Sequence, residues 1–153
     1  MEVCKVTASV DDLGGLILEV FRLNGCLIAE GDRKVAPFGL SSARWQVLGA
    51  VDRSSEAQTV SQLAREAGVS RQAVQRIANT LIDDGLLEMA DNPRDRRAQL
   101  VKMTEKGQAA YAKADSIRRE WLKDVAKHFD REEMERAAKL LAKARFLLSS
   151  PLS

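Results

Sequence analysis

The stretch from Thr59 to Leu81 holds two short amphipathic segments joined at a glycine, and this feature constrains the fold more than any other. The hydroxyl of Thr59 can cap a helix, and Gln62, three residues later, can complete a capping box. Gly68 stands where a positive φ would end that helix, and Ser70 can cap the next one. The pattern therefore predicts two helices with a tight turn, a helix-turn-helix.

The second predicted helix separates its side chains into an apolar and a polar face. Val74, Ile77 and Leu81 recur at helical spacing and are expected to face the core. The opposite face carries only guanidinium and amide groups, from Arg71, Gln72, Gln75, Arg76 and Asn79. These groups match guanine and adenine edges in the major groove of DNA. A solvated face usually mixes both signs of charge, and no acidic residue stands between Ser70 and Asp83, so the pattern favours DNA recognition over solvation alone.

A change from helical to alternating spacing after Gly85 predicts a β-hairpin. An apolar strand at residues 86–89 leads into the turn-forming residues Asp91-Asn92-Pro93, and residues 98–103 form the return strand. Thr104 then begins a long helix, which holds the hairpin at both ends. A hairpin directly behind a helix-turn-helix is a wing. The expected fold is thus mainly α-helical with a small β-hairpin wing, a winged helix-turn-helix.

The tip of the predicted wing, Arg94-Asp95-Arg96-Arg97, concentrates positive charge on a loop. Such a loop can enter an adjacent minor groove or lie along phosphates. Asp95 could hold one neighbouring arginine in a fixed direction through a bidentate pair. Taken alone, the tip would be an ordinary charged turn. Its place behind a helix-turn-helix favours a contact with DNA.

These motifs together resemble the MarR (multiple antibiotic resistance regulator) family of winged-helix transcription factors. The resemblance is carried by VSRQAVQRIANTLIDDGLL, by the wing pattern from Asn92 to Arg97 and by LVKMTEKG at residues 100–107, and it extends more loosely from Leu13 to Leu148. It implies a minor-groove contact from Arg97, with Asp95 as its orienting partner. The predicted DNA-binding residues are Ser70, Arg71, Gln72, Gln75, Arg76, Asn79, Arg94, Asp95, Arg96 and Arg97.

The two ends of the chain carry more apolar residues than a small DNA-reading domain needs. A helix over residues 11–28 has a wide apolar stripe, and Asp130 can cap a final apolar helix. We therefore expect a helical dimerisation region at residues 1–34 and 108–153, around a winged helix-turn-helix domain at residues 35–107. A two-fold pair would read a palindrome in consecutive major grooves, about 34–36 Å apart.

Residues 31–39 are predicted to be a connector, because two glycines and a proline interrupt the helical pattern. Ser41 or Ser42 then caps a helix, which by the resemblance supports the DNA-reading helices from behind. The residues of this helix expected to face inward are Ala43, Val47, Ala50 and Val51, with Trp45 and Leu48 beside them.

Composition and motifs argue against several other classes of protein. With 153 residues, 30% of them charged and 45% hydrophobic, the chain is typical of a globular domain, and its net charge of +2 leaves any DNA affinity to the placement of its arginines. No stretch approaches the roughly 20 apolar residues that cross a bilayer, and no signal peptide is recognised, so we expect a cytoplasmic protein. No metal-ligand spacing, catalytic Ser/His/Asp set or phosphate loop is found, so no metal, cofactor or enzymatic activity is expected.

The resemblance also implies a small lipophilic or phenolic effector, or an oxidant, as the signal. The aromatic residues proposed for an effector pocket are Phe21, Phe38, Trp45 and Trp121, although large aromatics at helical positions more often belong to the core. Cys26 is expected to be a buried, inert thiol within the first helix, whereas Cys4 could be oxidised.

The function expected from these features is a DNA-binding transcriptional regulator. It would act as a repressor that binds a palindromic operator as a homodimer and is released or altered by a small-molecule effector. Two alternatives stay open. One is a redox-responsive regulator that acts through Cys4 or Cys26, and the other is a winged-helix protein-interaction module without DNA binding.

Overall fold

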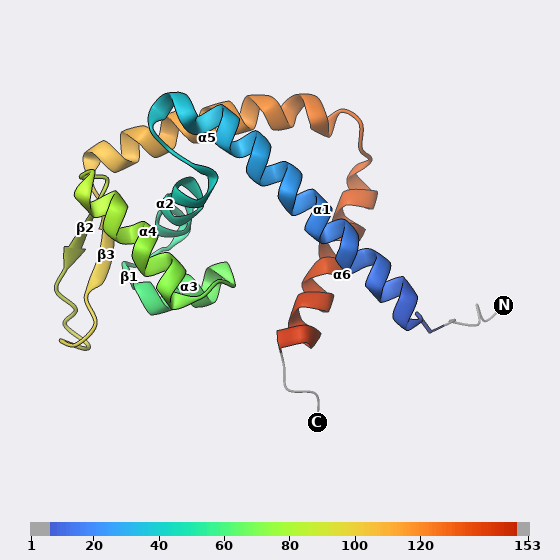
Figure 1. Ribbon diagram of the computed structural model, residues 1–153, viewed down its shortest axis with the longest axis horizontal. Helices are drawn as coiled ribbons and strands as arrows, with labels where there is room; N and C mark the ends of the chain where they lie inside the picture. Colours follow the sequence, from blue (N-terminus) through green and yellow to red (C-terminus); the bar gives the residue numbers. More distant parts are fainter. Residues whose placement is uncertain (1–6, 150–153) are drawn as a thin grey trace. The chain divides into compact units, whose positions relative to one another are not determined.

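The computed structural model describes residues 7–149, in a chain that forms two compact units, one ending at Asp115 and the next beginning at Ser116. The first unit holds α1 (Val10–Val35), the 3-10 helix η1 (Ala36–Phe38), α2 (Ser42–Arg53), β1 (Gln58–Thr59), α3 (Val60–Ala67), α4 (Arg71–Asp83), β2 (Leu87–Ala90) and β3 (Leu100–Met103) (Figure 1). Helix α5 (Glu105–Ala126) runs from the first unit into the second, which also contains α6 (Arg131–Ser149). None of the described helices is long and apolar enough to span a membrane.

The predicted wing is present as part of a three-stranded antiparallel sheet. Strands β2 and β3 pair over all four residues of each and form the expected hairpin. The short strand β1 pairs with the other edge of β3, opposite Leu100 and Val101, so the strand order is β1-β3-β2. Strand β1 was not expected, because two polar residues carry no alternating pattern. Its pairing ties the start of α3 to the wing.

The core of the first unit lies among α2, α3, α4, the sheet and the end of α1. Its largest fully buried side chains are Leu48, Leu63, Leu81, Leu87, Val35, Val74 and Val101. The predicted inner face of α4 is confirmed. Ala43 of α2 is exposed, contrary to the prediction, and Ala67 of α3 is exposed as well. Both alanines stand near helix ends, where they border a shallow apolar hollow lined by residues of α2, α3 and α4.

The caps predicted for the helix-turn-helix are confirmed. The Thr59 hydroxyl oxygen accepts from the N–H of Gln62 at 3.3 Å, and Oε1 of Gln62 accepts from the N–H of Thr59 at 2.8 Å. Gly68 has φ of 68°, which ends α3. Ser70 Oγ accepts from the N–H of Ala73 at 3.2 Å and begins α4. Local hydrogen bonds therefore set both sides of the turn.

Helix α1 begins one residue before the predicted start and is capped by Ser9. Both the N–H and the hydroxyl of Ser9 donate to Asp12 Oδ2 at 2.8 Å, and the Asp12 N–H donates back to Ser9 Oγ. These bonds, the backbone one first, lower the pKa of Asp12. The first turn of α1 is thus held by a capping box.

The connector predicted at residues 31–39 is mostly helical, because α1 continues to Val35. Gly31 does not break the helix but allows α2 to come close: a Cβ at this position would lie 2.3 Å from Ser42 Oγ. The Ser42 hydroxyl donates to the carbonyl of Ile28 at 2.9 Å, and its N–H donates to Asp32 at 2.6 Å. Of the two candidate serines, Ser41 is therefore the cap and Ser42 the contact between α1 and α2.

The start of α5 is held against the turn that follows α4. Thr104 Oγ1 accepts from the N–H of Gly107 at 3.0 Å, which confirms the predicted cap, and its hydroxyl donates to the carbonyl of Gly85 at 2.7 Å. Gly107 packs on the backbone, since a Cβ there would lie 2.0 Å from the carbonyl oxygen of Leu86. The predicted attachment of the wing at both ends is thus present in the structure.

The second unit is built from the last part of α5 and from α6. The predicted cap of α6 is confirmed, because Asp130 Oδ2 accepts from the N–H of Glu133 at 3.2 Å. None of the described side chains from Ser116 onward is buried. This unit therefore lacks a closed apolar core of its own within a single chain.

Candidate nucleic-acid interface

The polar face of α4 lies on the surface, as its composition predicts. Four of its five residues are exposed and Gln75 is half-buried. Gln75 Nε2 donates to Asn79 Oδ1 at 2.9 Å, which leaves the Gln75 carbonyl and the Asn79 amide hydrogens free for other partners. Within residues 7–149, no ion pair engages Arg71 or Arg76. The face thus offers guanidinium groups and a linked amide pair to a ligand.

The tip of the wing is ordered by side-chain hydrogen bonds to the backbone. Asn92 Nδ2 donates to the carbonyl of Ala98 at 2.8 Å and so closes the loop. Asn92 Oδ1 accepts from the N–H of Arg94 at 3.0 Å and from that of Asp95 at 3.3 Å. Asp95 Oδ1 in turn accepts from the N–H of Arg97 at 3.0 Å. Such turns fix a loop backbone without strand pairing.

The bidentate pair predicted between Asp95 and an arginine is not formed in the part of the chain that the structure describes. The Asp95 carboxylate accepts from the main chain of Arg97 instead. The reason is proximity, because an aspartate easily reaches an N–H two residues further on. Pairing with a guanidinium would instead cost the arginine side chain its conformational freedom about several rotatable bonds. Asp95 thus acts on the backbone from which the exposed Arg96 and Arg97 side chains project.

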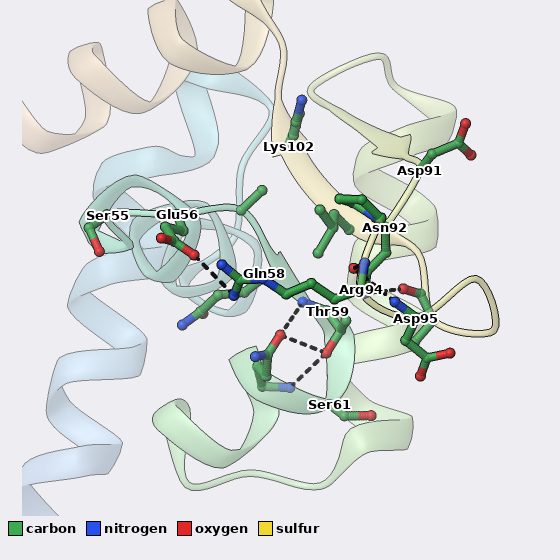
Figure 2. Close-up of a pocket in the computed structure, with 15 residues that line it drawn as sticks. Ser55, Glu56, Gln58, Thr59, Ser61, Asp91, Asn92, Arg94, Asp95 and Lys102 are labelled. Atoms are coloured by element: carbon green, nitrogen blue, oxygen red, sulfur yellow. Dashed lines mark hydrogen bonds and ion pairs between the residues drawn. The ribbon is translucent and has the colours of Figure 1, made fainter.

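A groove lies between the wing, the loop after α2 and the start of α3 (Figure 2). Its volume is about 920 Å³. The Arg94 side chain extends across it from the wing, and its Nη1 lies 3.5 Å from Glu56 Oε2 (Figure 2). Gln58 also lines the groove, and its Oε1 is buried without a hydrogen-bond partner while its Nε2 donates to Glu66.

The sequence reasoning missed Glu56 and Gln58 as neighbours of the wing. Both lie between α2 and α3, and the pairing of β1 with β3 brings this segment beside the wing, where Glu56 pairs with Arg94. Nothing local to Glu56 indicates its partner.

The structure places the four aromatic residues proposed for an effector pocket in different surroundings. Phe38 and Trp45 are half-buried and pack against the core of the first unit. Phe21 is 69% exposed on α1. Trp121 is half-buried and belongs to the second unit. The groove at the wing and the apolar hollow beside α4 are lined by other residues.

The prediction for Cys26 is wrong, because this thiol is free and exposed. It stands on α1, where large apolar residues such as Leu23 and Leu27 are also exposed, so none of the described residues covers that part of the helix. Cys4 lies outside the described residues. Among residues 7–149 there is no group of three or more His, Cys, Asp or Glu side chains that could hold a metal ion.

Comparison with known proteins identifies the central part of the chain. A family model described as MarR family matches residues 38–98, which run from η1 to the tip of the wing. An uncharacterised protein of Mycobacterium tuberculosis is 44% identical over 97 residues. That match covers 63% of this chain and 66% of the relative, just under two thirds of its length.

Solved structures of transcription regulators share the fold over most of the chain. MosR of M. tuberculosis, solved in complex with DNA, is 26% identical with a TM-score of 0.72, over 88% of this chain and 98% of that one. The transcriptional repressor CouR, bound to a 23-mer DNA duplex, is 22% identical with a TM-score of 0.74, over 92% and 99% of the two chains. The match of the helix-turn-helix and wing to the family model, on a fold shared with these regulators, shows that residues 38–98 of this chain form a winged helix-turn-helix of the MarR family.

Proposed function

We propose that this protein binds a palindromic DNA operator as a homodimer, acts as a repressor in the cytoplasm, and is released by a small effector. The observation that carries the proposal is the exposed face of α4, with its arginines and linked amides and without any acidic side chain, next to an ordered wing tip that projects two arginines. The family match and the DNA complexes of MosR and CouR support it.

In this proposal α4 enters the major groove and the wing reaches the adjacent minor groove. Gln72, Gln75 and Asn79 would contact base edges, and the arginines of α4 would contact guanines or phosphates. Arg97 would enter the minor groove from a backbone position set by Asp95. The residues assigned to DNA are Ser70, Arg71, Gln72, Gln75, Arg76, Asn79, Arg94, Asp95, Arg96 and Arg97.

The terminal helices would form the dimer. The exposed large apolar residues of α1 are Val10, Leu13, Leu18, Val20, Phe21, Leu23, Leu27 and Ile28, and those of α6 are Met134, Leu140, Leu141, Phe146, Leu147 and Leu148. Many large exposed apolar side chains along one helix are typical of an interaction site. We assign residues 1–34 and 108–153 to dimerisation and residues 35–107 to DNA binding. A two-fold pair would present two copies of α4 to successive major grooves.

The effector would be a small lipophilic or phenolic compound. The aromatic residues Phe21, Phe38, Trp45 and Trp121 remain the candidates for its binding site. In some dimer conformations the spacing of the two α4 helices would not match successive major grooves. An effector that bound preferentially to these conformations would raise their population and so release DNA. Repression is proposed because CouR, which shares the fold, is described as a repressor.

A fluorescence titration with duplex DNA tests the DNA-binding part of the proposal. The probe would be a palindromic duplex selected by the protein from a random pool, and a scrambled duplex of equal length would be the reference. Arg71→Glu and Arg97→Glu should each weaken binding at least tenfold, because each replaces attraction to the polyanion by repulsion. Arg53→Glu, which makes the same change of charge at an exposed position at the end of α2, should have little effect.

Two results would contradict the proposal. One is a wild-type protein that binds no selected duplex better than the scrambled one at moderate salt. The other is binding that survives both charge reversals, which would show that α4 and the wing do not contact DNA. Either result would favour the alternative of a winged helix used for protein interaction.

A further inference from the structure

Polar contacts from α2 and from the start of α5 converge on residues 84–86, which join α4 to β2 and are called the α4–β2 junction below. Arg44, in the first turn of α2, forms an ion pair with Asp84. Lys106 Nζ, in the first turn of α5, donates to the carbonyl oxygen of Asp84 at 2.7 Å. The hydroxyl of Thr104 donates to the carbonyl of Gly85 at 2.7 Å. The junction is therefore held from both α2 and α5.

The Arg44 side chain is largely buried and is held in place by two partners. It is only 21% exposed, against 54% for Asp84. Its Nη1 donates to the carbonyl of Gly39 at 3.0 Å, Nη2 pairs with Asp84, and Nε is buried without a partner. Removing a guanidinium from water is unfavourable unless an anion compensates. Asp84 supplies that anion, so the two residues depend on each other.

The acidic end of α4 is locally unfavourable. Asp83 is its last residue and Asp84 its C-cap, and its last turn contains no basic residue. Carboxylates at a helix C-terminus oppose the helix dipole, whereas cations there are stabilising. The compensating cations come from other elements, Arg44 from α2 and Lys106 from α5. Asp84 is thus explained by its contacts with Arg44 and Lys106 and not by the stability of α4 alone.

We infer that Arg44 and Asp84 are positioning residues for DNA recognition: their ion pair sets the orientation of α4 against α2. The inference rests on the proposed function. Helices α2 and α4 lie side by side (Figure 1), and the contact between them is apolar along α4, through buried residues such as Val74 and Leu81. Apolar packing resists separation but tolerates small rotations, whereas an ion pair at one end of a helix does not.

Small rotations of α4 matter because base recognition is directional. Hydrogen bonds to base edges need donors and acceptors placed to within about 0.5 Å. The N-terminal end of α4 is already fixed by Gly68 and the Ser70 cap. The Arg44–Asp84 pair fixes the other end. With both ends held, the polar face of α4 keeps one direction before DNA arrives.

Arg44→Gln and Asp84→Asn test this inference, together with the double variant. The dissociation constants for the selected palindrome and for a scrambled duplex are measured beside the urea midpoint. Each single variant should weaken the specific complex by about tenfold, comparable to one lost base contact, and the scrambled complex by less than about twofold. The double variant should be no weaker than either single one, because both remove the same pair. Arg44→Lys, which keeps the charge, should restore most of the specific affinity.

The matched control is Arg53→Gln, which removes an exposed arginine from the other end of α2 and should leave both dissociation constants unchanged. A second readout does not involve DNA. Residual dipolar couplings of the free protein should show a changed angle between α2 and α4 in Asp84→Asn, a variant of the more exposed partner that keeps the fold measurable if Arg44→Gln unfolds.

Three outcomes would overturn the inference. The first is unchanged specific affinity in a folded Asp84→Asn variant. The second is an equal loss of specific and non-specific binding that follows the urea midpoint, which indicates a structural role only. The third is an unchanged angle between α2 and α4. A wild-type protein that fails to discriminate the two duplexes would instead overturn the proposed function and the inference with it.

Discussion

Similar apolar side chains have opposite environments in the winged helix-turn-helix and in the terminal helices. In the former, Leu48 and Leu81 are completely buried. On α1, Phe21 is 69% exposed and Leu23 is 56% exposed, and on α6 Leu148 is 63% exposed. Full burial of one such side chain contributes about 1.5–3 kcal/mol to stability. Covering the exposed side chains of α1 and α6 would therefore release a large favourable free energy.

The contrast shows that the winged helix-turn-helix has a closed apolar core, whereas the terminal helices leave large apolar side chains exposed. The winged helix-turn-helix has a core closed by its own helices and sheet. Helix α1 is anchored to that core at its C-terminal end, where Gly31 and Val35 are buried, while most of its other large apolar side chains are exposed within the described residues. A second copy of the chain is the partner that we propose for it.

The largest effect should come from charge placed in the uncovered stripe of α1. Leu23→Glu combined with Leu27→Glu should raise the dissociation constant of the homodimer at least about 100-fold, because two carboxylates per chain would be buried without partners. Analytical ultracentrifugation measures the change. Arg22→Glu, an equal or larger change of charge at an exposed polar position of the same helix, should leave the dimer intact. A dimer that survives the double substitution would place the interface elsewhere.

The next effect concerns the close backbone contact at the base of the wing. Gly107→Ala should destabilise the protein by about 2–4 kcal/mol, because the new Cβ would lie 2.0 Å from the carbonyl oxygen of Leu86. Urea unfolding measures the loss. Gly25→Ala on α1 is the control, since no atom lies within 4 Å of its Cβ position, and it should stabilise the helix by about 0.5–1 kcal/mol. A destabilising Gly25→Ala would instead indicate that the partner chain packs closely there.

A smaller effect should follow from loss of a helix cap. Thr59→Ala should lower the free energy of unfolding by about 1 kcal/mol, because the N–H of Gln62 loses its acceptor. Chemical denaturation measures the change, with Thr59→Ser as the control that keeps the hydroxyl. Asp130→Ala makes the equivalent change at α6. If α6 is stable only in the dimer, this second loss should depend on protein concentration, whereas the first should not.

The smallest effect concerns the ion pair across the groove. Glu56→Gln should tighten DNA binding by about two- to threefold, because Arg94 would no longer have to break its ion pair with Glu56 before it contacts a phosphate. The slope of log K against log salt should steepen by up to about 0.9, because the Glu56 carboxylate would no longer offset the counterion released when Arg94 contacts a phosphate. Glu66→Gln, at an exposed position on α3, is the control. An unchanged slope would mean that Arg94 does not contact phosphate.

Much of the fold could be predicted because its signals are local. Caps such as the Thr59–Gln62 box and turns such as Gly68 depend on residues three or four positions apart, so the sequence shows both partners at once. The alternating apolar pattern and the turn residues that predicted the wing are equally local. The exposed polar face of α4 followed from the helical period alone.

The missed features depend on residues far apart in the chain. Gly31 was interpreted as a break because only the distant Ser42 explains it as a contact point. The pair of Glu56 with Arg94 requires β1 to meet β3. Cys26 was expected to be buried because its neighbours are apolar, but apolar neighbours on a helix indicate a buried site only when another surface covers them.

The sequence by itself determined most of the helices and the wing hairpin, the caps that begin α3, α4, α5 and α6, and that α4 carries guanidinium and amide groups on one face. These properties follow from hydrogen bonds and side-chain periodicity within a few residues. Only the tertiary structure decided which apolar stripe is covered, that Asp95 holds backbone and not a side chain, and that Arg44 reaches Asp84. Burial and ion pairing depend on distances through space, and a chain brings those partners together only when it folds.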